Sequence, residues 1–145
     1  MAIKIIEAHF DPFYEMQAFQ AQLALNGQCG ATNIFIGTMR DFNEGDEVTA
    51  MTLEHYEGMT QKQLDNILSE TKAKWTILDA LIVHRVGEIL PRDPIVLIAV
   101  WSVHRKEAFE ACRYIMEALK HSAPFWKRET LVSNQTRWVQ KNTAG

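Results

Sequence analysis

The sequence predicts an α+β domain with a mostly antiparallel sheet. Segments with the composition of strands are interspersed with three segments of helical period, and short polar or Gly- and Pro-containing stretches between strand segments favour hairpins. The chain has 145 residues, 47% of them hydrophobic, which is enough apolar material for one core. No repeat or linker interrupts it, so residues 1–145 are expected to form one domain.

The predicted strands are rich in β-branched and aromatic residues. They are expected at 3–7, 31–39, 48–56, 78–86, 95–101 and 125–131. The second and third should pair as a hairpin around the polar loop 42–47, and the fourth and fifth should pair through 87–94. The segment 95–101 is apolar throughout, so both of its faces should be covered.

The first two predicted helices begin at residues that can cap them. Asp11 and Pro12 predict the start of a helix that ends at Asn26-Gly27. Thr60 and Gln63 form a capping box, which predicts the start of the second helix. The buried side of the first helix is expected to carry Phe13, Met16, Phe19 and Leu23.

The third predicted helix is amphipathic, with cations at both ends. Its apolar side is expected to consist of Ala108, Phe109, Cys112, Ile115, Met116 and Leu119. His104 and Arg105 lie at its beginning, where free backbone amides add positive potential. The strand that follows would place Lys127 and Glu129 on one face. Lys120, at the end of the helix, meets Lys127 if the chain folds back.

This basic cluster lies in a chain with a net charge of -3. A site for a small anion explains it, and the alternative is that the cations complement the helix dipole and solubilise the surface. General nucleic-acid binding is disfavoured because it needs a broad basic surface. A general phosphate- or nucleotide-binding enzyme is disfavoured because no Gly-rich loop precedes a helix.

The other polar residues suggest no further site. The histidines and cysteines lack metal-ligand spacing, so we expect no metal, no cofactor and no disulfide between Cys29 and Cys112. His84-Arg85, beside the turn at Gly87, is expected to make structural hydrogen bonds. No segment has the pattern of a signal peptide or the length of a membrane span, so a cytoplasmic location is expected, with no membrane partner.

Several sequence blocks, in order along nearly the whole chain, resemble the large, catalytic subunit of molybdopterin synthase. They are Gly37–Asp41, Leu53–Met59, His84–Gly87, Ser102–Arg105, Ala108–Ala111, Leu119-Lys120, Ala123–Glu129 and Arg137–Val139. The resemblance implies the α/β-hammerhead fold. The sequence departs from the family pattern at Thr38, where many members carry Lys.

The resemblance also implies an activity and partners. The family converts cyclic pyranopterin monophosphate to molybdopterin with sulfur carried as a thiocarboxylate on the C-terminal glycine of a small ubiquitin-like subunit. Two copies of the large subunit form the central dimer of a heterotetramer. Both reactants are anions, so a shared pocket needs cations. The residues implied for that pocket are Thr38, Met39, Arg40, His104, Arg105, Lys120, Lys127, Arg128 and Glu129. Phe125 and Trp126 are candidates for stacking on the pterin, and the alternative is that at least one of them packs in the core.

Lys120 is the first candidate for catalysis and Lys127 the second. Lys120 can stabilise the developing oxyanion, act as general acid or base, or act as nucleophile, and the sequence leaves these three roles open. A non-enzymatic module that binds the C-terminal tail of a ubiquitin-like partner is the main alternative function. The loop 41–47 is a candidate lid over the pocket.

Overall fold

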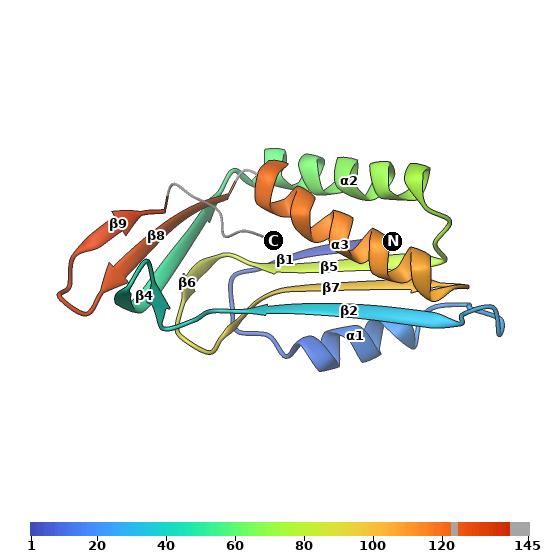
Figure 1. The fold of residues 1–145 in the computed structure, drawn as a ribbon, viewed down its shortest axis with the longest axis horizontal. Helices are drawn as coiled ribbons and strands as arrows, with labels where there is room; N and C mark the ends of the chain where they lie inside the picture. Colours follow the sequence, from blue (N-terminus) through green and yellow to red (C-terminus); the bar gives the residue numbers. More distant parts are fainter. Residues whose placement is uncertain (123–124, 140–145) are drawn as a thin grey trace.

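Two β-sheets lie side by side along the long axis of the molecule in the computed structural model, which describes residues 1–122 and 125–139 (Figure 1). The first sheet has the strand order β1-β5-β7-β2, in which only β1 and β5 run parallel. Its strands are β1 (Ala2–Ile6), β5 (Asp79–Arg85), β7 (Pro94–Ser102) and β2 (Ala31–Thr38). Helices α2 (Glu57–Lys74) and α3 (Arg105–Ser122) cover one face, and α1 (Pro12–Gln20) covers the other.

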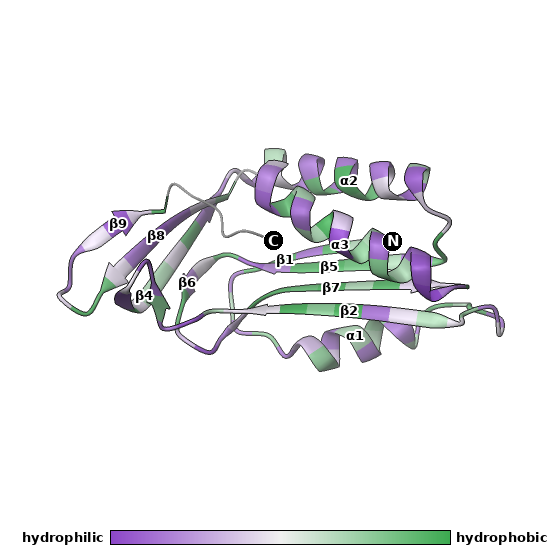
Figure 2. Ribbon diagram, in the orientation of Figure 1, coloured by the Kyte–Doolittle hydropathy of each residue, from purple (hydrophilic) through white to green (hydrophobic). Residues whose placement is uncertain are grey.

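The first sheet is buried on both sides, as the apolar segment 95–101 predicted. Val96, Ile98 and Val100 of β7 pack in the core under α2 and α3, whereas Leu97 and Trp101 pack in the core on the α1 side. β5 and β7 are accordingly hydrophobic along most of their length, while β8 and β9 are largely hydrophilic (Figure 2). The central strands therefore form a rigid base for the helices.

The second sheet is built around a long strand, β4 (Asp46–His55). The order is β3-β4-β8-β9, and β6 also pairs with β4. The other strands are β3 (Phe42–Asn43), β6 (Gly87–Ile89), β8 (Phe125–Leu131) and β9 (Thr136–Trp138). A third apolar cluster, which includes Met39, Met51 and Leu53, packs against this sheet. The end of β2 and the end of α3 both meet it.

The predicted α+β class, the mostly antiparallel pairing and the three helices are confirmed. The antiparallel pairing of β5 with β7 and the strand 125–131 are also as predicted. Cys29 and Cys112 are free thiols. None of the helices in the described part of the chain is long and apolar enough to cross a membrane.

The predicted hairpin between 31–39 and 48–56 is wrong. β2 pairs with β7, whereas β4 pairs with β8. The chain reverses inside the predicted loop instead, because Glu44 and Gly45 both have positive φ (52° and 82°) and form the tight turn of the β3–β4 hairpin. The reversal sends β4 into the other sheet.

The predicted helix ends need correction. α1 ends at Gln20 rather than at Asn26-Gly27, because the following residues leave the helix to pack Leu23 against the core on that side. The cap at Asp11 is confirmed, since its side chain accepts hydrogen bonds from the amides of residues 13 and 14. α2 begins at Glu57, so Thr60 lies inside the helix and does not cap it.

Two aromatic side chains predicted to be inside are exposed. Phe13 is 65% exposed and Phe109 is 61% exposed. The buried side of α3 consists of Ala108, Ala111, Cys112, Ile115 and Leu119. Phe109 lies about 100° around the helix from Ala108, and this rotation turns it away from the sheet.

Gly30 is fixed by close packing, and we expect Gly30→Ala to destabilise the protein by about 1–3 kcal/mol. A Cβ at Gly30 would lie 2.2 Å from the carbonyl oxygen of Val103, so the backbone before α3 would have to move. Gly58→Ala is the control, since nothing lies within 4 Å of its Cβ, and in the first turn of α2 it should be neutral or slightly stabilising. Equal urea midpoints for the two variants would contradict the prediction.

Candidate functional site

Two adjoining cavities lie where the end of α3 meets the second sheet. We call the larger one, about 370 Å³, the main cavity and the smaller one, about 150 Å³, the side cavity. The main cavity is lined by Phe35, Ile36, Gly37, Thr38, Leu53, His84, Ile95, Val96, Met116, Leu119, Lys120, Phe125 and Lys127. The side cavity is lined by Thr38, Met39, Arg40, Phe42, Asn43, Met51, Ile95, Lys120, Lys127, Glu129 and Val139. Four residues, Thr38, Ile95, Lys120 and Lys127, line both cavities, so the two cavities share part of their wall.

Lys120 and Lys127 converge on this site as the sequence predicted. Lys120 lies in the last turn of α3 and Lys127 on β8, and both line both cavities. The pKa of Lys127 is lowered, first by burial and then by the charges of Lys120 and Arg40, while Glu129 opposes the shift. Lys127 therefore gives up its proton more easily than an exposed lysine does.

Glu129 lines the side cavity and is held in a hydrogen-bonded network. Its carboxylate accepts hydrogen bonds from Asn43 Nδ2 at 3.0 and 3.2 Å and from Arg137 Nε at 3.0 Å. Arg137 Nη1 also donates to Asp46 at 2.8 Å, and these acceptors raise the pKa of its guanidinium. The predicted loop 41–47 is therefore a hairpin tied to β8 and β9, and its movement as a lid stays a prediction.

The end of β2 carries Thr38, Met39 and Arg40 into the site. The amide of Met39 donates to the carbonyl of Asp93 at 2.9 Å, and the amide of Arg92 donates to the carbonyl of Met39 at 2.8 Å. The β6–β7 connection thus holds this segment by its backbone. Thr38 lines both cavities, buried Met39 lines the side cavity, and the guanidinium of Arg40 lies 5.1 Å from the ring centroid of Phe42.

Three predicted site residues are not brought to these cavities within one chain. His104 and Arg105 lie at the beginning of α3, and an 18-residue helix is about 27 Å long, so they are remote from Lys120 at its end. Arg128 lies on the opposite face of β8 from Lys127, with its guanidinium 5.8 Å from the ring centroid of Trp138. Their roles in substrate binding stay predictions.

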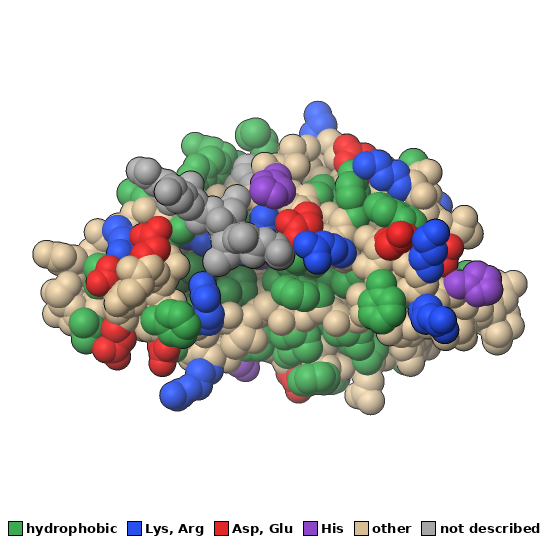
Figure 3. Space-filling view, in the orientation of Figure 1, with side chains coloured by type: hydrophobic (Ala, Val, Ile, Leu, Met, Phe, Trp, Pro, Cys, Tyr) green, Lys and Arg blue, Asp and Glu red, His purple; other side chains and the backbone are tan. Residues whose placement is uncertain are grey.

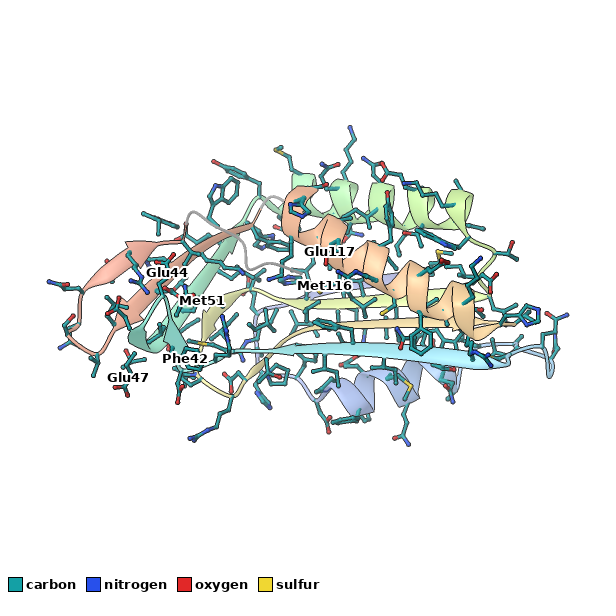
Figure 4. The ribbon with its side chains drawn as sticks, in the orientation of Figure 1. Phe42, Glu44, Glu47, Met51, Met116 and Glu117 are labelled. Atoms are coloured by element: carbon teal, nitrogen blue, oxygen red, sulfur yellow. The ribbon has the colours of Figure 1, made fainter. Side chains whose placement is uncertain are left out.

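The structure adds residues that the sequence reasoning did not assign to the pocket. Met116 of α3 lines the main cavity, and Phe42 and Met51 line the side cavity (Figure 4). Phe125, a stacking candidate, does line the main cavity, while Trp126 is 43% exposed and packs edge-on against Tyr56. Met116, Phe42 and Met51 are apolar like residues of the core, and no local signal in the sequence distinguished them from core residues.

Among the added residues, His84 is the one with chemistry of its own. Its structural role is confirmed, since Nδ1 lies 2.8 Å from the carbonyl oxygen of Arg85. Its ring also stacks on Phe125, with centroids 4.1 Å apart and an interplanar angle of 15°. Burial is the main reason that the pKa of His84 falls to about 4, and Lys127 and His55 lower it further. His84 is therefore a neutral imidazole in the wall of the main cavity.

The lowered pKa of His84 predicts a pH dependence of stability. Because the folded-state pKa lies below the unfolded value of 6.5, the unfolded chain binds the proton more tightly. Stability should therefore be full above pH 6.5 and fall as the pH drops toward 4, by about 3 kcal/mol from this group. Urea unfolding of wild type and His84→Gln across this range checks it. Parallel pH curves would contradict it.

No cluster of three or more metal-ligating side chains occurs in the part of the chain described here. A separate feature is an apolar patch over β2 and α3 (Figure 3). On it Ile34 and Phe35 of the edge strand β2 are 37% and 40% exposed, next to the exposed Phe109. The patch adjoins the main cavity through Phe35.

Comparison with known proteins gives one consistent result. The family model of the MoaE protein matches residues 9–122. The chain is 50% identical to a molybdopterin synthase catalytic subunit from Ralstonia nicotianae, over 94% of this chain and 76% of the relative. It is 46% identical to that of Pseudomonas aeruginosa, over 97% and 91%. The crystal structure of molybdopterin synthase from Staphylococcus aureus matches with a TM-score of 0.83 at 31% identity, over 95% of this chain and 96% of that one. The chain belongs to the MoaE family of molybdopterin synthase catalytic subunits.

Proposed function

We propose that this chain transfers sulfur from the thiocarboxylated C-terminal glycine of a small ubiquitin-like carrier to cyclic pyranopterin monophosphate, forming the dithiolene of molybdopterin. Residues 1–145 act as one catalytic-subunit domain in the cytoplasm. The observation that carries the proposal is the convergence of Lys120 and Lys127 on a cavity in a chain of this family. Its volume of about 370 Å³ falls in the range of small-molecule sites.

The charges of the cavity suit both reactants. The substrate phosphate and the carrier thiocarboxylate are anions, and Lys120, Lys127 and Arg40 surround the space that they would share. Each transfer replaces a carbon–oxygen bond of the substrate side chain by a carbon–sulfur bond to the carrier thiocarboxylate, and the displaced oxygen leaves as water or stays on the phosphate. Water then breaks the acyl carbon–sulfur bond of the resulting thioester, which leaves the sulfur on the substrate as a thiolate and the carrier glycine as a carboxylate. Two carriers are used for each product.

Lys120 and Lys127 have different roles in the proposed reaction. Lys120, at the boundary of the two cavities, stabilises the negative charge that develops on the carrier's terminal carbonyl oxygen. Lys127, with its lowered pKa, contacts the substrate phosphate or the carrier tail and can exchange a proton there. Glu129 counters the lowering of the Lys127 pKa and so favours the charged form of this lysine.

Self-association uses the edge of the first sheet. β2 is an edge strand with Ile34 and Phe35 exposed, and Phe109 extends the same apolar patch. We propose that a second copy covers this patch to form the central dimer. His104 and Arg105 are too far from the cavities of their own chain, so they can reach a substrate only in a pocket formed with another copy.

A single-turnover assay tests the function. Purified chain, thiocarboxylated carrier and cyclic pyranopterin monophosphate are mixed, and dithiolene product and released carrier are quantified together. We expect product with two carriers consumed. Carrier that binds tightly while no product forms would favour the non-enzymatic tail-binding module instead.

A further inference from the structure

His84 is held in one orientation by contacts on two sides. Phe125 covers one face of the ring, and the edge with Nδ1 lies on the carbonyl oxygen of Arg85. His84 is 7% exposed and lines the main cavity. The parts of the ring left for the cavity are therefore the opposite face and the edge with Nε2.

The contact at Nδ1 also fixes the tautomer. A carbonyl oxygen only accepts hydrogen bonds, so Nδ1 must carry the proton and donate it to Arg85. In a neutral imidazole the other nitrogen then has a lone pair and no proton. Burial and the charge of Lys127 keep the ring neutral near pH 7. Nε2 is thus an acceptor, in a wall that otherwise consists mostly of apolar side chains and lysines.

We propose that Nε2 of His84 accepts a hydrogen bond from an N–H group of the substrate's pterin ring in the main cavity, and thereby determines how the ring is oriented. This rests on the proposed function. The apolar lining of the cavity, including Phe35, Leu53 and Phe125, suits a flat heterocycle. The lysines lie on the side shared with the side cavity, where the anionic end of the substrate belongs. An acceptor at the apolar end of the main cavity favours a ring that presents an N–H donor to it.

Loss of this acceptor should weaken substrate binding more than it slows the chemical step. His84→Phe keeps an aromatic ring against Phe125 and removes the acceptor, whereas His84→Gln offers an amide oxygen. We expect His84→Phe to weaken the affinity for cyclic pyranopterin monophosphate at least tenfold, and His84→Gln to recover part of the loss. Product formation at saturating substrate should stay within about threefold of wild type, and carrier affinity should not change.

His55→Phe is the matched control. His55 also faces Phe125, with centroids 6.4 Å apart, but it lines a different cavity with Glu7 and Glu57 and does not line the main one. Its replacement should leave substrate affinity unchanged. An equal loss in both variants would show that packing around Phe125 is responsible, and it would overturn the proposal.

A second measurement compares ligands that differ in their N–H donors, on wild type and on His84→Phe. Pterin is compared, as a competitor of the substrate, with pterins methylated on the ring N–H or on the amino group. At least one methylated compound should bind at least tenfold more weakly to wild type, and His84→Phe should lose this discrimination. Equal binding of all three to wild type would overturn the assignment of His84. Failure of wild type to form product would instead overturn the proposed function.

Discussion

Replacing Lys120 with Ala is expected to slow product formation in a single turnover by at least about a hundredfold, while affinity for the carrier stays within about threefold. Lys120 lies in the last turn of α3 and lines both cavities, so its ammonium lies where substrate and carrier tail would meet. Charge develops on the carrier carbonyl mainly in the transition state. A group that acts there affects the rate far more than it affects binding.

Lys120→Arg separates electrostatic stabilisation by this residue from proton transfer and from covalent catalysis. A guanidinium keeps the positive charge but does not release a proton or act as a nucleophile near pH 7. Recovery of most of the rate would favour electrostatic stabilisation, and a rate as low as that of the Ala variant would favour proton transfer or covalent catalysis. Lys62→Ala, an exposed lysine on α2 that lines neither cavity, is the control. A Lys120→Ala variant as fast as this control would contradict the assignment.

The parts of this fold that could be predicted from the sequence depend on local pattern. The apolar run of β7 and the alternation in β8 predicted both strands and the face on which Lys127 lies. The meeting of Lys120 with Lys127 could be predicted because the helix and the strand that carry them follow each other closely in the sequence, α3 ending at Ser122 and β8 beginning at Phe125. The resemblance to the family supplied Arg40 and Met39, which no periodicity would have identified.

The failures have a common physical cause, because each depends on partners distant in sequence. The 31–39 and 48–56 strands look like a hairpin locally, yet β2 pairs with β7 and β4 pairs with β8. His84 enters the cavity wall because Phe125, which belongs to the other sheet, stacks on it. His104 and Lys120 lie at opposite ends of α3 in one chain, so their joint role in substrate binding stays a prediction.

Asp93→Ala is expected to lower the free energy of unfolding by about 3–5 kcal/mol. Nη1 of Arg85 donates to Asp93 Oδ2 at 3.0 Å, and the Arg85 side chain is only 9% exposed. Without Asp93 this buried guanidinium keeps the carbonyl of Glu88, at 2.7 Å, but loses its counter-charge. Asp93 also accepts a hydrogen bond from the amide of Leu90, so its loss releases the β6–β7 connection as well.

The pH dependence of this contribution follows from the pKa of Asp93. Burial raises that pKa, but the Leu90 amide and the Arg85 side chain outweigh burial, and the net pKa is lowered. A carboxyl whose folded-state pKa lies below the unfolded value stabilises the protein above the unfolded pKa, and the effect is lost as the pH falls through the folded one. The deficit of Asp93→Ala relative to wild type should therefore be largest near neutral pH and shrink in acid.

The same variant should damage the site, because the connection that Asp93 anchors holds Met39 by two backbone hydrogen bonds and so positions Arg40. Urea unfolding and substrate affinity are measured together, with Lys4→Ala as control, since the exposed Lys4–Glu15 pair should contribute less than about 1 kcal/mol. The double variant Arg85→Leu/Asp93→Leu removes both charges and should recover much of the stability without recovering the affinity. If Asp93→Ala cost no more than Lys4→Ala, the pair would not hold this connection, and the placement of Arg40 would have to depend on β2 alone.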